Sequence, residues 1–271
     1  MTWTARTVDR DGIRLACRDW AGPGRPVVLL HGLAGHAGEW DVLAERLSAR
    51  HRVVAVDQRG HGACEGQPTD LSRAAYVADV LAVLDQLELE EPVLVGQSLG
   101  GHTALLTAAG HPERLHAAVL VEAGAGGPNP GVQEEIGGLL DAWPRPFPDR
   151  AAAVEFFGGG PVGEAWAAGL EGRDGGWWPR FDREAMTDSL AELARRAYWQ
   201  EWTDITCPVL LVLGQSGIIP REETERMLRL RPTTRAVSLP GTGHDLHLER
   251  PAELDRLLAD FLTGLPHTVR V

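Results

Sequence analysis

The stretch VLVGQSLGG, residues 93–101, joins a short apolar run to a pattern typical of a helix. Ser98 stands between Gly96 and Gly100, and a Gly-x-Ser-x-Gly sequence at a strand-to-helix junction is typical of a nucleophile elbow. The glycines are needed because so tight a turn leaves no room for side chains two positions to either side of the serine. We therefore expect Ser98 to be a nucleophile presented at the end of a strand.

A serine hydroxyl is a weak nucleophile near neutral pH, so a base has to take its proton. His244 lies in LPGTGHDLHLERP, residues 239–251, on a glycine-containing loop that follows the last predicted strand. A serine early in the chain and a histidine late in it is the order found in elbow-type enzymes. His247 is the nearest alternative, but we expect it to face the following helix or solvent.

The segment VVLLHGLAGHAGEW, residues 27–40, contains a strand that ends in a turn. Backbone N–H groups at such a turn and just after the nucleophile form the oxyanion hole of this kind of site, and we assign them to Leu33 and Leu99. His31 is interpreted as a structural residue that ties the loop together. His36 is a candidate substrate contact.

Apolar runs alternate with helical patterns along the chain, which predicts an α/β fold with a mostly parallel sheet flanked by helices. We expect a helix from Asp70, which would cap it, and another from Arg250, with a proline in its first turn. The predicted strands lie within residues 13–20, 26–31, 51–57, 92–97, 117–123, 208–214 and 235–240.

Residues 124–205 contain no convincing strand, and so long a connection is unusual in a compact domain. We predict an inserted helical cap (lid) at 124–205 and a core formed by 1–123 and 206–271. Six of the nine tryptophans lie in this interval. Trp177 and Trp178 are candidate substrate contacts, although tryptophans can equally form the interior of a cap.

The composition excludes several kinds of chemistry. All 26 basic residues are arginine, which removes lysine nucleophiles and lysine phosphate ligands. The net charge of -12 argues against binding to nucleic acid or an anionic membrane through a positive field. Three widely spaced cysteines and a polar N-terminus predict a cytoplasmic protein without a disulfide framework, metal site or cofactor. The oligomeric state is left open.

The chain resembles the α/β-hydrolase-fold superfamily. The resemblance extends from HGLAG (31–35) through DQRGHG (57–62) and GQSLGG (96–101) to GTGHDLHLERP (241–251). In relatives the second of these motifs is a structural turn, so Asp57 and Arg59 are interpreted as a pair that fixes this loop.

One position departs from the superfamily pattern. An aspartate usually follows the strand that precedes GQSG, residues 214–217, and here Gly217 stands in its place. Glu222 and Glu223 follow shortly, but they suit the solvated first turn of a helix and are expected to point away from His244.

The resemblance also supplies a replacement acid. Haloalkane dehalogenases, and lactone hydrolases similar to those acting on zearalenone, carry their acid at the end of the strand after the nucleophile. Glu122 ends the apolar run AAVLV at that position, where α/β sheets place their sites. We therefore predict a triad of Ser98, His244 and Glu122.

These assignments predict a serine hydrolase that cleaves an ester or lactone of a small, apolar or aromatic substrate through an acyl-enzyme. Two alternatives stay open. The first is a cofactor-independent dioxygenase of the same fold, with His36 binding its substrate. The second is a non-catalytic ligand receptor built on a hydrolase fold.

Overall fold

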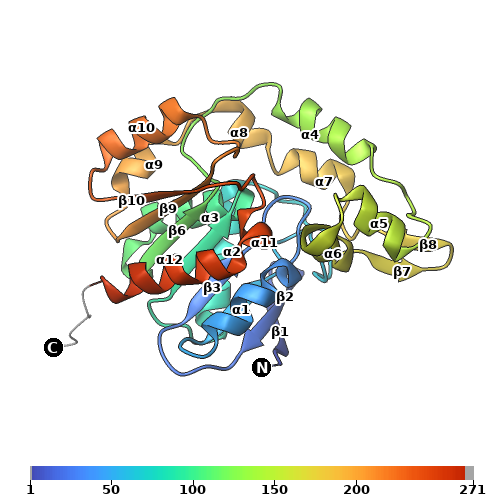
Figure 1. Ribbon diagram of the computed structural model, residues 1–271, viewed down its shortest axis with the longest axis horizontal. Coiled ribbons are helices and arrows are strands. Elements are labelled where there is room, and N and C mark those ends of the chain that lie inside the picture. Colours follow the sequence, from blue (N-terminus) through green and yellow to red (C-terminus); the bar gives the residue numbers. More distant parts are fainter. Residues whose placement is uncertain (1, 266–271) are drawn as a thin grey trace.

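An eight-stranded sheet forms the centre of the computed structural model, which describes residues 2–265 (Figure 1). Its strands run in the order β1-β2-β4-β3-β5-β6-β9-β10. The two pairings from β1 to β4 are antiparallel, and every pairing from β4 to β10 is parallel. Their bounds are β1 Thr4–Arg10, β2 Ile13–Trp20, β3 Val27–Leu30, β4 Val53–Val56, β5 Val93–Gln97, β6 Ala117–Val121, β9 Val209–Gly214 and β10 Arg235–Leu239.

The strands from β3 to β6 are buried over their whole length, which explains why they read as continuous apolar runs. All seven strands predicted from the sequence are present, and the predicted mostly parallel sheet is confirmed. Strand β1 was missed, because it is a largely exposed edge strand with polar residues.

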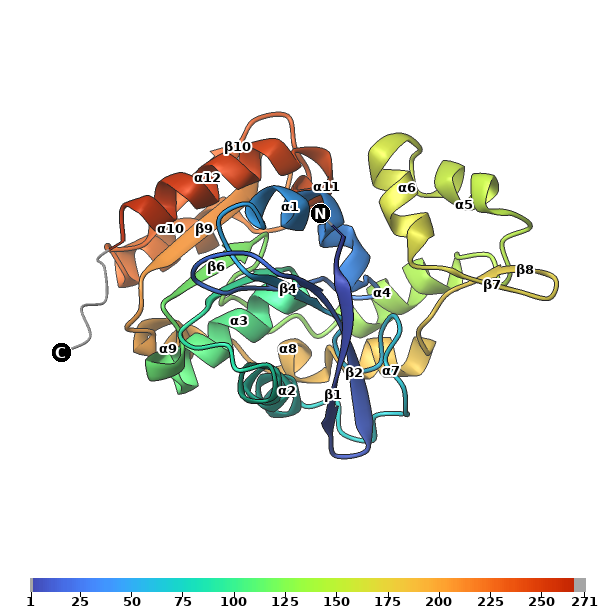
Figure 2. The same ribbon diagram turned by 90° about the horizontal axis from the view of Figure 1, so that it is seen from below.

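Helices cover both faces of the sheet (Figure 2). Apolar side chains of α1 (Asp41–Leu47) and α12 (Pro251–Thr263) pack on one face. Those of α2 (Arg73–Gln86), α3 (Leu99–Gly110) and α9 (Trp199–Asp204) pack on the other. The remaining helices outside the insertion are η1 (Ala37–Trp40), η2 (Pro112–Arg114), α10 (Arg221–Leu230) and α11 (Leu246–Glu249). No helix within residues 2–265 is both long and apolar enough to cross a bilayer.

The cap of α2 differs from the sequence prediction. Ser72, not Asp70, is its N-cap, and the Ser72 side chain accepts a hydrogen bond from the Ala75 N–H. Asp70 instead accepts from the Ser72 N–H, so it lies in the loop just before the cap. Both residue types suit an N-cap, so the pattern alone did not separate them.

Residues 124–205, here called the inserted segment, extend beyond one side of the sheet with α4 to α7 and return to it with α8 and α9 (Figures 1 and 2). The segment is helical as expected, except for one short hairpin. Its elements are α4 Val132–Asp141, α5 Arg150–Phe156, α6 Gly160–Ala168, β7 Glu171–Arg173, β8 Gly176–Trp178, α7 Arg183–Asp188, α8 Ala191–Arg195 and α9. Trp202 of α9 is fully buried in the main core, so the end of the segment packs with the sheet.

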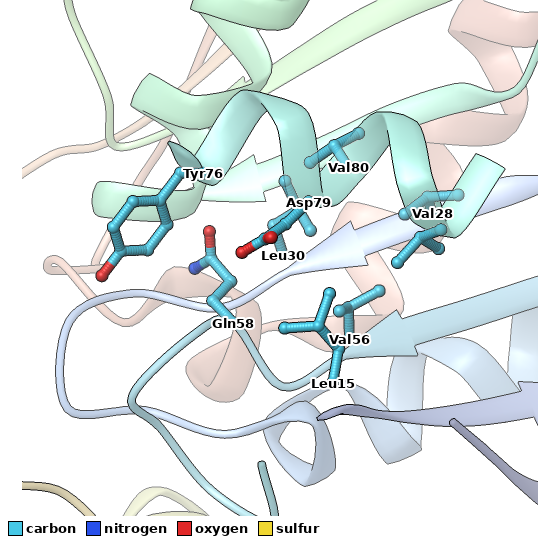
Figure 3. A pocket seen from close by; sticks show the side chains of 9 residues that line it. Leu15, Val28, Leu30, Val56, Gln58, Tyr76, Asp79 and Val80 are labelled. Carbon is cyan, nitrogen blue, oxygen red and sulfur yellow. The ribbon is translucent and has the colours of Figure 1, made fainter. Parts of the chain in front are cut away.

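A small cavity of about 10 Å³ lies in the core between the sheet and α2 (Figure 3). Its lining is aliphatic except for Gln58, Tyr76 and Asp79, and the Tyr76 hydroxyl points away from the aliphatic side chains. A space of this size holds about one water molecule, so it cannot be the substrate site.

Two buried histidines stabilise the loops beyond β3 and β4. His31 Nδ1 donates to the Gly32 carbonyl, and its Nε2 accepts from the Gln58 N–H. His61 Nδ1 donates to the Arg59 carbonyl. Burial lowers the pKa of His31 to about 4 and that of His61 to about 3, because the charged rings would lose their hydration. Both rings are therefore neutral near pH 7.

We predict that the free energy of unfolding falls as pH is lowered from about 6.5 toward 4. In this range the unfolded chain binds protons that folded His31 and His61 do not, so each contributes a slope of about 1.4 kcal/mol per pH unit. Their contribution is fully present above about pH 6.5. Urea unfolding between about pH 6.5 and 5 measures the slope, and His61→Gln should reduce it; an equal slope in this variant would contradict the prediction.

Candidate active site

Ser98 lies at the junction of β5 and α3 with a strained backbone, φ 51° and ψ -116°. A Cβ on Gly96 would lie 2.1 Å from the Gly100 carbonyl oxygen, and one on Gly100 would lie 2.4 Å from the Leu30 carbonyl oxygen. Only glycine therefore permits this turn to pack against β3. The Ser98 N–H donates to the Val121 carbonyl at 2.9 Å, which joins the turn to β6.

The sheet changes winding direction between β3 and β5, since β4 lies on one side of β3 and β5 on the other. Open α/β sheets bind ligands at such a point, outside the carboxyl ends of the strands. A Cβ on Gly32 would lie 3.4 Å from Ser98 Cβ, so the loop after β3 reaches the serine here. Leu33 packs in the same apolar cluster as Leu99. Within residues 2–265, neither the Leu33 nor the Leu99 N–H donates to another residue.

Glu122 follows β6, the neighbour of β5, and also has a positive φ, 49°. Its side chain is 1% exposed. The Gly214 N–H donates to one carboxylate oxygen at 2.7 Å, and the Ile218 N–H donates to the other at 2.7 Å. Backbone donors on both oxygens stabilise an ionised carboxylate and fix its direction.

His244 lies in the loop between β10 and α11, with its side chain 33% exposed. Its Nδ1 is 3.5 Å from Glu122 Oε2. This separation is longer than the hydrogen-bond distance of about 2.6–3.2 Å expected for a base and its acid. The carboxylate is held back by the two amides, which fix both of its oxygens.

Gln97 holds the other side of the His244 ring. Its amide nitrogen lies 3.1 Å from His244 Nε2 and 3.1 Å from the His244 carbonyl oxygen. An amide NH₂ can only donate, so Nε2 is the accepting nitrogen and the ring proton is on Nδ1, toward Glu122. Within the described residues Ser98 Oγ makes no hydrogen bond, so the Ser98 contact expected for Nε2 is replaced by Gln97. In the sequence, the only sign of this role for Gln97 was its position next to Ser98.

Gly217 is glycine because Glu122 occupies the space beside it. A Cβ on Gly217 would lie 2.1 Å from both carboxylate oxygens of Glu122. The position where the superfamily usually has its aspartate is thus filled from the neighbouring strand. Any side chain at 217 would collide with the carboxylate.

Several sequence predictions need correction. Asp57 and Arg59 do not pair with each other: Asp57 accepts from the Ala37 and Ala63 N–H groups, and Arg59 pairs with Asp79. Each fixes its loop through a different, distant partner.

The two glutamates of α10 also differ from each other. Glu222 is exposed, as expected. Glu223 is partly buried and accepts from the Gly126 N–H at 2.7 Å, and desolvation raises the pKa of its carboxyl group. It therefore ties α10 to the chain after β6 instead of lying on a solvated face.

The proposed substrate contacts have the following surroundings in the structure. His36 is 6% exposed and uses both ring nitrogens within the protein, because Nδ1 accepts from the Gly38 N–H and Nε2 contacts the Ala165 carbonyl. Trp177 and Trp178 lie on β8, at the outer end of the inserted segment (Figure 1). Trp177 packs there against Phe147, so the alternative interpretation, a tryptophan interior of this segment, fits it better.

Comparison with known proteins identifies the family of the chain. The family model described as alpha/beta hydrolase family matches residues 27–257. The chain belongs to the alpha/beta hydrolase family. It is 26% identical over 270 residues to 2-(acetamidomethylene)succinate hydrolase of Mesorhizobium japonicum, covering 95% of each protein.

Solved structures show the same fold. The crystal structure of E-2-(acetamidomethylene)succinate hydrolase superposes with a TM-score of 0.86 at 26% identity, covering 97% of this chain and 100% of the other. The enol-lactonase of Burkholderia xenovorans superposes with a TM-score of 0.77 at 25% identity, covering 96% and 100%. The predicted α/β-hydrolase fold is confirmed, and the chain is similar to hydrolases throughout.

We predict that nitrogen NMR of the histidine rings finds His244 protonated on Nδ1, because Gln97 occupies the Nε2 lone pair. Gln97→Met removes this donor at similar length and should increase the form protonated on Nε2. A His244→Asn spectrum identifies the signal. Gln86→Met is the control, since Gln86 contacts only the exposed Asp9 region and should leave His244 unchanged. An unaltered His244 signal in Gln97→Met would disprove the assignment.

Proposed function

We propose that this protein is a serine hydrolase that cleaves esters or lactones through an acyl-enzyme, with Ser98, His244 and Glu122 as its triad. The observation that carries the proposal is the orientation of His244. Its Nδ1 faces the buried Glu122 carboxylate at 3.5 Å, and its Nε2 keeps a lone pair. This is the ring form that a general base needs.

In the proposed reaction His244 Nε2 takes the Ser98 proton while the hydroxyl oxygen attacks the acyl carbonyl. The contact with Gln97 has to yield to Ser98 at this step. Glu122 stabilises the imidazolium, and the Leu33 and Leu99 amides donate to the developing oxyanion. Leu99 is the first residue of α3, so its N–H has no acceptor within the helix. Water then cleaves the acyl-enzyme to release a carboxylic acid.

The surroundings of these amides support an apolar acyl group. Leu33 and Leu99 belong to a cluster with Leu190, Val132 and Ile136 of the inserted segment. We infer that the inserted segment acts as a cap over this cluster. The names of two similar proteins, E-2-(acetamidomethylene)succinate hydrolase and an enol-lactonase, support the proposal of acyl-bond cleavage. No step of the proposed chemistry uses a cofactor.

We predict that a fluorophosphonate labels wild-type protein at Ser98 alone, because among the hydroxyls of residues 2–265 only this one has the proposed base and oxyanion donors beside it. Peptide mass spectrometry locates the label, and Ser98→Ala is the control. A panel of aryl esters, lactones and carbonates, assayed with the same two proteins, then defines the substrate class. Active protein that resists the label, or equal activity in Ser98→Ala, would contradict the proposal.

We predict that Glu122→Gln keeps the fold but lowers kcat by up to about 10⁴-fold, the effect of neutralising a triad acid. The amide cannot stabilise the imidazolium as a carboxylate does. Glu222→Gln, an exposed change on α10, is the matched control and should have little effect. Comparable kcat values in the two variants would remove Glu122 from the mechanism.

We expect that the proposed catalytic carboxylate can be supplied either after β6, at position 122, or after β9, at position 217. Gly217→Asp on its own brings a Cβ within 2.1 Å of the Glu122 oxygens, so the exchange requires Glu122→Gly as well. Glycine also suits the positive φ at 122. We predict that Glu122→Gly with Gly217→Asp recovers part of the kcat lost in Glu122→Gly. A folded double variant no faster than Glu122→Gly would show that residue 217 does not reach His244.

A further inference from the structure

Two consecutive residues of α6 contact two different loops of the proposed site. The Ala165 carbonyl accepts a hydrogen bond at 2.9 Å from Nε2 of His36, which lies in the loop after β3. The next side chain, Trp166, donates its Nε1–H to Asp245 Oδ2 at 3.0 Å, beside His244. One helix of the inserted segment therefore bridges the loop of the proposed oxyanion donor and the loop of the proposed base.

The His36 contact has a defined direction. Nδ1 accepts from the Gly38 N–H at 3.1 Å, so the ring proton is on Nε2 and points at Ala165. The fit is close, because a Cβ on Gly169 would lie 2.5 Å from His36 Cδ2. His36 is only three residues from Leu33, so α6 is attached near the proposed oxyanion donor.

The Trp166 contact is oriented by aromatic packing. Its ring stacks on Phe157, with centroids 5.8 Å apart and planes at 26°, and meets Trp143 edge to face at 5.9 Å and 86°. These contacts fix the indole plane, so its N–H has one direction to point. Asp245 accepts this N–H and directly follows His244 in the chain.

We propose that α6 is a clamp that sets the separation between the Leu33 amide and the His244 ring, and that Trp166 and His36 are positioning residues for the reaction. This inference rests on the proposed function. An oxyanion hole and a base act on the same reacting carbonyl, so their separation has to match the transition state. The two loops lie far apart in sequence, and α6 gives them a common support.

The test removes one N–H and keeps the ring. In Trp166→Phe the aromatic packing is largely retained, but the donor to Asp245 is lost. We expect the rate constant of fluorophosphonate labelling at Ser98 to fall about 10-fold, as for a small misplacement of reacting groups, with an unchanged melting temperature. Trp199→Phe is the matched control, since its indole N–H makes no hydrogen bond within residues 2–265 and its ring packs on the main core and beneath Arg226, so it should label like wild type.

Two further variants test the contact itself. Asp245→Asn keeps an oxygen that can accept the indole N–H and should retain most of the labelling rate, whereas Asp245→Ala should match Trp166→Phe. The double variant Trp166→Phe/Asp245→Ala should label no more slowly than either single variant, because both remove one interaction. His36→Asn keeps a side-chain cap for η1 but is too short to reach Ala165, so it should also slow labelling.

The outcomes separate the inference from the proposed function. Wild-type protein that is not labelled at Ser98 would refute the proposed function. If wild type is labelled and Trp166→Phe is labelled equally fast, or if Trp199→Phe is slowed as much as Trp166→Phe, the clamp is overturned. Faster labelling of Trp166→Phe would also overturn it, because α6 would then be a barrier to entry.

Discussion

The backbone of Ser98 is the constraint on which the rest of the site depends. A φ of 51° with ψ of -116° is a conformation that costs a residue with a side chain about 1–3 kcal/mol. The turn persists because β5 is paired on both sides, and because Gly100 lets α3 approach the Leu30 carbonyl. The hydroxyl is thereby fixed at the winding point of the sheet, and the other proposed groups have to reach it from neighbouring strand ends.

The proposed acid meets this constraint from the strand next to the serine. Glu122 directly follows β6, also with a positive φ, and its carboxylate extends toward the amides of Gly214, at the end of β9, and Ile218, beyond it. Gly217 and Glu122 are therefore linked by one steric condition. The Glu122 carboxylate fills the space that a side chain at 217 would occupy, so only one of the two positions can provide a carboxylate. The same pair of amides that holds the carboxylate keeps it 3.5 Å from His244, so its charge acts on the ring across a short gap.

The sequence predicted what depends on local patterns and missed what depends on distant partners. Buried strands read as apolar runs, and the elbow is recognisable because its glycines are adjacent to Ser98. Strand β1 was missed because its exposed residues carry no apolar pattern. His36 was interpreted as a substrate contact, but in the structure its ring nitrogens form hydrogen bonds with Gly38 and Ala165. Ala165 lies in a segment that begins almost ninety residues after His36, and no local sequence pattern indicates so distant a partner. For the same reason Asp57 was matched with its neighbour Arg59 instead of the loop amides that it binds.

The inserted segment shows how non-directional and directional interactions divide their roles. Its aromatic side chains bury large surfaces, which stabilises the segment but permits many orientations against the core. A few polar contacts select one of these orientations. Glu192 of α8 accepts from the Arg73 N–H at the start of α2, and Ser189 is bonded to Tyr76 at 2.8 Å. At the loops of the proposed site, α6 makes its contacts with His36 and Asp245. Because these polar contacts attach the segment to the core at the start of α2 and at both loops of the proposed site, a shift of the segment cannot leave the loop geometry unchanged.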